Sequence, residues 1–232
     1  MVMNELFFPL LKRKPIYYYY SRKGDFFSAS NYQRNYPTVA DDCKHRCVYC
    51  DVTEKECGGE HFSLDHFRPR DIFVNKFNGI LVKHPYNLYL SCQKCNVLKS
   101  KDWKGCVKTI NGHTYSLGEG YVDRFYEDIN NYVEVDSSGR IYAKALPLPI
   151  IKNPAYYMIE RLRLNRPNRV YIRQKRIVKL LAREIEVMLN CLNIDLINKY
   201  NNNLISAEEC LEKIKKLQLL NDKYVGLNIL SK

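Results

Sequence analysis

The chain has 232 residues, 46% of them apolar and 27% charged, which suffices for one or two folded domains with a sizeable core. Lys and Arg number 37 against 25 Asp and Glu, and the net charge of +12 favours a polyanionic partner, nucleic acid ahead of a membrane surface. No apolar run reaches the roughly 18 residues of a membrane helix, and the N-terminus does not resemble a signal peptide. We therefore expect a cytoplasmic protein without a membrane partner, in which the nine cysteines are thiols or metal ligands rather than disulfides.

Charge divides the chain into three regions. Residues 1–40 form a basic and aromatic N-terminal segment with six basic and two acidic residues. Residues 41–151 hold fifteen of each sign together with most of the cysteines and all the histidines, so we expect the chemistry there. Residues 152–232 hold sixteen basic and eight acidic residues, and we expect a basic helical C-terminal region.

The N-terminal segment contains the run IYYYY at 16–20. Aromatic residues favour strands, so a strand with one buried face is the first interpretation. An exposed stacking or docking element is the alternative.

Two C-x2-C pairs predict a structural Zn²⁺ site. Cys47 and Cys50 form the first pair and Cys92 and Cys95 the second, with 41 residues between them. Each pair can offer two thiolates from one tight turn, which is half of a tetrahedral zinc shell. Redox or core thiols are the alternative, and the neighbouring Cys43, His45 and Cys57 are rival ligands.

The stretch FSLDHFRPR at 62–70 reads as a strand that ends in Asp65 and His66, with Arg68 and Arg70 around a proline. Hydrolysis of a phosphodiester needs an activated water and a cation on the developing charge. A histidine can take a proton near neutral pH, and a carboxylate suits a hard cation. An isolated Asp-His pair is more often a surface ion pair or turn, so the pair alone does not establish catalysis.

Two hairpins and a boundary are predicted next. The Asn-Gly pair within 107–117 predicts a tight turn, and residues 132–143 predict a second hairpin with a polar turn. The proline-rich stretch 146–154 predicts the boundary before the helical region.

The C-terminal region predicts two helices. Between Arg161 and Arg183 there are nine basic residues and no acidic one. Apolar residues recur there at helical spacing, namely Val170, Ile177, Leu181, Ile185, Met188 and Leu192. Arg169, Arg173 and Arg176, with Arg183, fall on another side, and we predict that this side contacts nucleic-acid phosphates, with a merely solvated face as the alternative. Ser206 and Glu209 predict a capping box that starts the second helix.

The order of these motifs resembles the HNH endonuclease family, in its zinc-knuckle subgroup. The resemblance lies in Asp65-His66, then Asn87, then the pattern C-x2-C-N-x2-K from Cys92 to Lys99. It implies an α+β fold with a ββα-metal core, two zinc knuckles, small hairpins and a helical C-terminal tail.

The same resemblance implies roles for the site residues. His66 would be the general base, Asp65 and Asn96 would hold a catalytic Mg²⁺ or Mn²⁺, and Asn87 would brace the loop and orient His66. Three basic residues, Arg68, Arg70 and Lys99, would contact phosphate. Asn96 stands where many family members have histidine, and it still offers an oxygen ligand.

A narrower resemblance rests on DHFRPR, Trp103 and the stretch RLRLNRPNRVYIRQKR at 161–176. These features resemble the HNH nuclease subunit of Septu-type antiphage defence systems, which implies DNA cleavage beside an ATPase subunit. The alternatives are an RNA-cleaving HNH toxin and a non-catalytic, zinc-stapled adaptor that binds nucleic acid or the ATPase.

Overall fold

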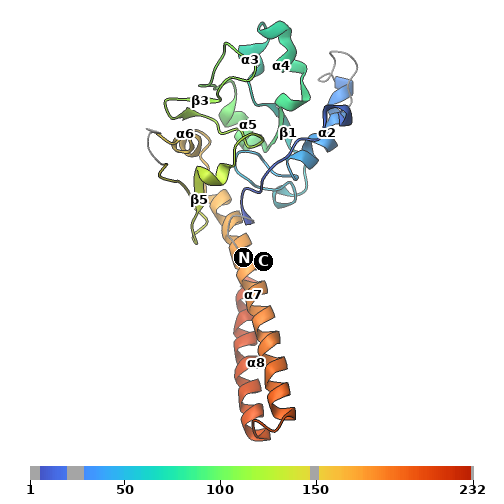
Figure 1. Ribbon diagram of the computed structural model, residues 1–232, viewed down its shortest axis with the longest axis vertical. Helices are drawn as coiled ribbons and strands as arrows, with labels where there is room; N and C mark the ends of the chain where they lie inside the picture. The colour runs from blue at the N-terminus through green and yellow to red at the C-terminus, as the bar shows by residue number, and fades with distance from the viewer. Residues whose placement is uncertain (1–5, 20–28, 147–151, 231–232) are drawn as a thin grey trace. The chain divides into compact units, whose positions relative to one another are not determined.

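The computed structural model describes residues 6–19, 29–146 and 152–230 (Figure 1). The chain divides into two compact units, Met1–Ile172 and Arg173–Lys232. Within the described ranges, the helices include none that is long and apolar enough to cross a membrane. The mixed α and β content, the small antiparallel hairpins and the helical C-terminal region confirm the predicted fold class at that level.

The first unit is organised around two short antiparallel strands and the helix that follows them. Strand β1 (Ser63–His66) pairs with β2 (Leu88–Ser91), with Asp65 opposite Tyr89. All four residues of β2 are buried, and α5 (Gln93–Lys99) begins two residues after it and contacts β1. Helix α2 (Ala29–Asp42) packs against β2.

The long connection from β1 to β2 contains two one-turn helices, α3 (Arg70–Phe73) and α4 (Ile80–Lys83). Aromatic rings fix this connection to the strands. Phe67 stacks on Tyr89 with ring centroids 4.5 Å apart, and Trp103 meets the edges of Phe67 and Phe73 at 5.7 and 5.9 Å. Such pairs contribute about 0.5–1.5 kcal/mol each beyond their buried area. They hold the end of β1 in a fixed position relative to α3.

The predicted hairpin at 132–143 is present as β5 (Val133–Val135) and β6 (Ile141–Ala143). The predicted Asn-Gly hairpin is not formed, although Ile110 and Asn111 lie in a turn, because none of the described strands pair across that turn. The hairpin there consists of β3 (Tyr115–Ser116) and β4 (Glu119–Gly120), and its turn lies at 117–118. Gly112 is required for another reason, because a β-carbon on it would lie 2.4 Å from Cβ of Cys106.

The strand expected at 16–20 is also wrong where the structure describes it. Ile16–Tyr18 form a 3-10 turn, η1, after Pro15, whose ring fixes its φ and which has no N–H to donate to a strand. Tyr17 is 75% exposed, whereas Tyr19 is buried and its hydroxyl donates to Asp42. Residue 20 lies outside the described residues.

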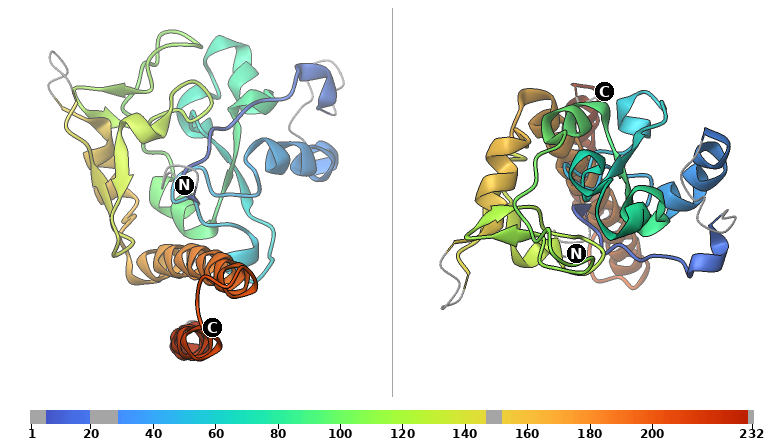
Figure 2. Two further views of the ribbon diagram at one scale, coloured as in Figure 1. Left: turned by 60° about the horizontal axis from the view of Figure 1, so that its bottom comes forward. Right: turned by 90° about the horizontal axis from the view of Figure 1, so that it is seen from above.

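Helix α6 (Pro154–Arg161) packs against β4 and β6 (Figure 2). Asn153 caps its first turn by accepting a hydrogen bond from the amide of Ala155 at 2.8 Å. The chain then makes a tight turn before α7 (Pro167–Asn201) begins. The regional boundaries at residues 40 and 151 stay predictions, and residues 147–151 lie outside the described part.

The second unit consists of the rest of α7 and α8 (Ala207–Leu230), which run antiparallel to each other (Figure 1). The amide of Glu209 donates to Ser206 Oγ at 3.1 Å, as the predicted cap requires. The predicted apolar stripe on α7 is confirmed at Ile177, which is buried, but is shifted beyond that residue. Ala182, Leu189 and Leu196 are buried, whereas Leu181, Ile185, Met188 and Leu192 are 42–63% exposed.

Candidate metal centre and adjoining groove

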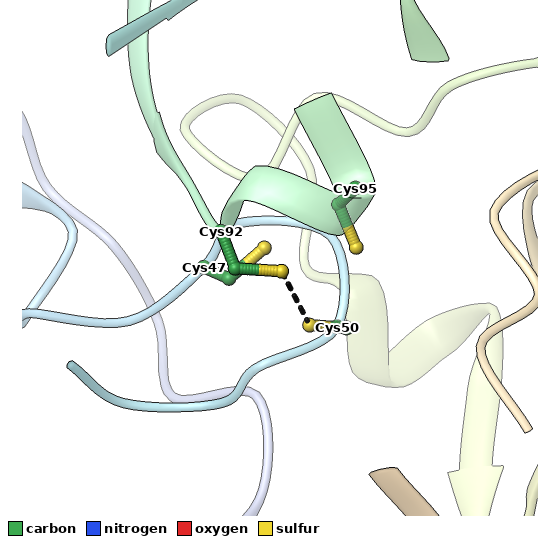
Figure 3. Close-up of side chains that lie close together, drawn as sticks. All are labelled: Cys47, Cys50, Cys92 and Cys95. Atoms are coloured by element: carbon green, nitrogen blue, oxygen red, sulfur yellow. Dashed lines mark hydrogen bonds between the residues drawn. The ribbon is translucent and has the colours of Figure 1, made fainter. Parts of the chain in front are cut away.

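The four cysteines of the two C-x2-C pairs meet in one buried cluster. The sulfurs of Cys47, Cys50, Cys92 and Cys95 lie within 4.8 Å of one another, and those of Cys50 and Cys92 are 3.7 Å apart (Figure 3). A tetrahedral Zn²⁺ with Zn–S bonds of about 2.3 Å places its sulfurs about 3.8 Å apart. The cluster therefore fits a structural zinc ion in donor type, number and spacing.

A tight turn presents the first pair of thiols, and the start of a helix presents the second pair. The Cys47 amide donates to the Val52 carbonyl at 2.8 Å, and Asp51 adopts a left-handed φ of 63°, which tightens the first knuckle. The buried Asp51 carboxylate pairs with Arg46 at 2.7 Å. Cys92 and Cys95 instead lie at the start of α5, one turn apart (Figure 3).

The rival ligands lie outside the cluster. Cys43 accepts a hydrogen bond from the Leu90 amide at 3.4 Å, and burial raises the pKa of its thiol to about 11. The ring of His45 lies between two carboxylates, 2.6 Å from Glu54 and 3.2 Å from Asp41. The hydrogen bond to Glu54 is the main cause of its raised pKa. Cys57 is half-buried and does not belong to the cluster.

Two arginines from the C-terminal region point at the sulfurs. Arg166 Nη2 lies 3.6 Å from the Cys95 sulfur, and Arg169 Nη2 lies 3.4 Å from the Cys92 sulfur. Burial acts to lower the pKa of Arg169, but the thiolates of Cys50 and Cys92 outweigh it, so the pKa is raised.

The predicted phosphate contacts of Arg169 and Arg173 need correction, because both side chains are buried, at 7% and 1% exposed. A buried guanidinium cannot reach a phosphate without a change of conformation. Arg176 is half-buried and stays a prediction.

A groove of about 260 Å³ lies beside the C-terminal half of α5, on the side away from the first turn that carries the cysteines. It is lined by Asp65 and His66 at the end of β1, by Arg70 at the start of α3 and by Asn96 on α5. Asn96 thus shares one concave surface with three residues that lie 26 to 31 positions before it in the sequence. Carboxylate and amide oxygens are ligand types that suit Mg²⁺ or Mn²⁺.

Asp65 is held from two sides. The hydroxyl of Tyr49 donates to Asp65 Oδ2 at 2.6 Å, and Lys99 Nζ lies 3.1 Å from the same oxygen. Lys99 also donates to the His66 carbonyl at 2.9 Å. Because Lys99 is fully buried, the predicted contact of Lys99 with phosphate needs correction. In the structure it anchors the end of β1.

His66 is half-buried at the mouth of the groove. Its Nε2–H donates to the Val82 carbonyl at 2.9 Å, which in the neutral ring leaves the lone pair on Nδ1. Burial is the main cause of a lowered pKa, to which Lys99 and Arg70 add. The neutral ring is the form that can accept a proton.

Asn87 closes the long loop between the strands. Its Oδ1 accepts from the Arg68 amide at 2.9 Å, and its Nδ2 donates to the carbonyls of Arg68 at 3.0 Å and Leu81 at 2.7 Å. These bonds tie both ends of the loop together. Asn87 thus braces the backbone just after β1 and the backbone within α4, and it does not contact the ring of His66 in these hydrogen bonds.

The prediction that Arg68 contacts phosphate also needs correction. The side chain is 8% exposed, its Nη2 donates to the Gly112 carbonyl at 2.8 Å, and its guanidinium lies 5.0 Å from the centre of the Trp103 ring. Arg68 therefore fastens the 105–114 loop to the aromatic core.

Sequence reasoning missed several residues of the site, among them Tyr49, Asp71 and Lys101. Tyr49 lies inside the first knuckle and positions Asp65, and the exposed Lys101 lines the groove. Lys101 could have been noticed as the second lysine of the LKSK stretch, but Tyr49 has no signal in a single sequence.

Comparisons with models of protein families, with curated proteins and with solved structures found no match to this chain. A functional proposal therefore rests on the groove, the cysteine cluster and the sequence motifs.

Proposed function

We propose that the chain is a metal-dependent endonuclease of the HNH type, which hydrolyses phosphodiester bonds of DNA. One observation carries the proposal: Asp65 and His66 at the end of β1 line one groove with Asn96 of α5, the helix whose first turn belongs to the cysteine cluster. The antiparallel β1–β2 pair followed by α5 suits a ββα-metal core.

The roles follow from the chemistry of the side chains. His66 accepts the proton of the attacking water at Nδ1, because its Nε2–H is held by the Val82 carbonyl. Asp65 and Asn96 would hold Mg²⁺ or Mn²⁺, and such a cation supplies positive charge to the phosphoryl and leaving oxygens. Tyr49 and Lys99 keep the Asp65 carboxylate in place.

The exposed cationic side chains of the groove would contact the phosphates of the substrate. Arg70 and Lys101 line it and are exposed, so they can reach phosphates on either side of the scissile bond. The net charge of +12 favours a polyanion over a small phosphate ester.

We extend the proposal to an effector nuclease of a bacterial antiphage defence complex with an ATPase partner, as in Septu-type systems. Support comes from the DHFRPR and L-x-L-N-R-P resemblances. Each residue of the latter motif has a defined place: Leu162 and Leu164 are buried, Asn165 Nδ2 donates to the Ile141 carbonyl at 2.8 Å, and Arg166 faces the cysteine cluster.

Cleavage of plasmid DNA by purified protein tests the proposal, with Mg²⁺, Mn²⁺ or EDTA and with RNA beside DNA. We expect cutting only with a divalent cation and a loss of about 10²-fold or more in His66→Ala. His113→Ala, an exposed histidine outside the groove, is the matched control. Equal cutting by His66→Ala would refute the assigned base, and cutting of RNA alone would identify a toxin-like nuclease.

A second candidate, a non-catalytic adaptor, is favoured by the ion pair that already neutralises Asp65. Its carboxylate oxygens lie 3.1 and 3.5 Å from Lys99 Nζ. An adaptor needs no divalent cation, so DNA binding that is unchanged by Mg²⁺, without cleavage when the ATPase partner is present, would favour it.

A further inference from the structure

A zinc ion bound by the four cysteines would leave an excess of negative charge in a buried place. Four thiolates around one Zn²⁺ carry a net charge of −2. All four cysteines are at most 2% exposed. A net charge buried away from water is costly unless other charges or hydrogen bonds compensate it.

The compensating charges come from Arg166 in the turn between α6 and α7 and from Arg169 in the first turn of α7. Besides its contact with Cys95, Arg166 Nη2 lies 3.8 Å from the Cys92 sulfur and 4.0 Å from the Cys50 sulfur. Arg169 Nη2 lies 3.4 Å from Cys92. Two guanidinium groups thus face three of the four sulfurs, and their charge of +2 balances the cluster.

The backbone of the turn holds Arg166 in this direction. Its Nη1 donates to the carbonyls of Leu162 at 3.1 Å and Arg163 at 3.2 Å, while Nη2 faces the sulfurs. Arg163 adopts a left-handed φ of 47°, and Pro167 then starts α7 with its φ already helical. These backbone contacts fix the direction of the guanidinium.

We propose that Arg166 and Arg169 are positioning residues of the zinc centre, whose N–H groups donate to the thiolates of Cys50, Cys92 and Cys95. They neutralise the excess charge, retain the zinc ion and make the sulfurs less reactive toward electrophiles. The inference rests on zinc binding by the four cysteines, not on nuclease activity.

Zinc retention in the full-length chain tests this role. The variants are Arg166→Gln, Arg169→Gln and their combination, with Arg169→Lys as the conservative change. Arg163→Gln is the matched control, because it removes one exposed charge from the same turn. Two readouts are followed: zinc transfer to a coloured chelator, and zinc release on reaction with N-ethylmaleimide.

We expect each Gln variant to bind zinc about 10- to 100-fold more weakly, as is typical when partners of metal ligands are removed. Its thiolates should also react faster with N-ethylmaleimide, Arg169→Lys should recover part of both effects, and Arg163→Gln should match wild type. A purely structural role would lower thermal stability without changing the reactivity of the thiolates.

Two outcomes would overturn the inference. One is a double variant with wild-type zinc affinity and wild-type alkylation rate. The other is a wild-type protein that binds no zinc at the four cysteines. If the double variant does not fold, the single variants and Arg169→Lys decide the question with the same readouts. Because these assays do not measure cleavage, failure of the nuclease proposal would leave their results unchanged.

Discussion

The two ends of α5 differ in chemistry although the helix has only seven residues. Its first turn offers the soft sulfurs of Cys92 and Cys95 in a dry cluster, while Asn96 faces an open groove beside Asp65. Soft thiolates select zinc, and oxygen donors select magnesium or manganese. The difference suggests that the zinc end of the helix is held fixed so that the groove end can carry out chemistry.

Loss of a cysteine ligand should have the largest effect. We expect Cys95→Ser to lose bound zinc and most of its cooperative thermal unfolding, because structural zinc contributes about 10–16 kcal/mol in small zinc-binding domains. Zinc content and a thermal melt measure this. Cys191→Ser, at an exposed cysteine outside the cluster, should behave as wild type. A fully stable, zinc-free Cys95→Ser would show that the cluster is not structural.

Removal of Lys99 should have the next largest effect. Lys99→Met leaves the buried Asp65 carboxylate without its cation, and breaking a buried ion pair costs about 3–5 kcal/mol. Urea unfolding measures the change. The exposed Lys101→Met is the control and should stay within about 0.5 kcal/mol of wild type. Equal stability of both variants would contradict the anchoring role of Lys99.

Asn87→Ala should destabilise the loop between the strands to a smaller extent. Three backbone groups of Arg68 and Leu81 lose a buried partner. Because water can enter the space that the side chain leaves and bond to most of these groups, we expect a total cost of about 1–3 kcal/mol, the penalty of one unsatisfied group. We expect a fall in melting temperature of about 2–4 °C for each kcal/mol. Asn111→Ala, at an exposed asparagine, is the control, and an unchanged Asn87→Ala would show that the loop does not depend on this side chain.

Arg70→Gln should have the smallest effect on the fold and act only on substrate binding. The side chain is exposed at the groove, so stability should stay within about 0.5 kcal/mol. The slope of log K against log salt for DNA binding should fall by about 1. An unchanged slope would remove Arg70 from the DNA contacts.

The sequence predicted the parts of the site that depend on short spacing. The two C-x2-C pairs fixed the number and type of thiols, and the Asp65-His66 pair lies at the end of a strand as expected. These features follow from local geometry, which a single sequence records.

The arginines could not be predicted in the same way. Arg68 and Arg169 read as cations for phosphate, but one is buried against Trp103 and the other against a thiolate. Whether a basic side chain faces solvent or a buried anion depends on contacts between residues 44 to 77 positions apart. Charge counts along the chain contain no such information. Tyr49 could not be predicted for the same reason, because its role depends on a contact with Asp65 that the sequence does not record.

The most direct test of a zinc site at one end of α5 and a second cation site at the other is to measure both metals on the same sample of each protein. Zinc content and Mn²⁺ binding by calorimetry would be compared in wild type, Asp65→Asn and Asn96→Ala. We expect all three proteins to keep zinc and only wild type to bind Mn²⁺ tightly. Unchanged Mn²⁺ binding in both variants, or none in wild type, would contradict a cation site in the groove.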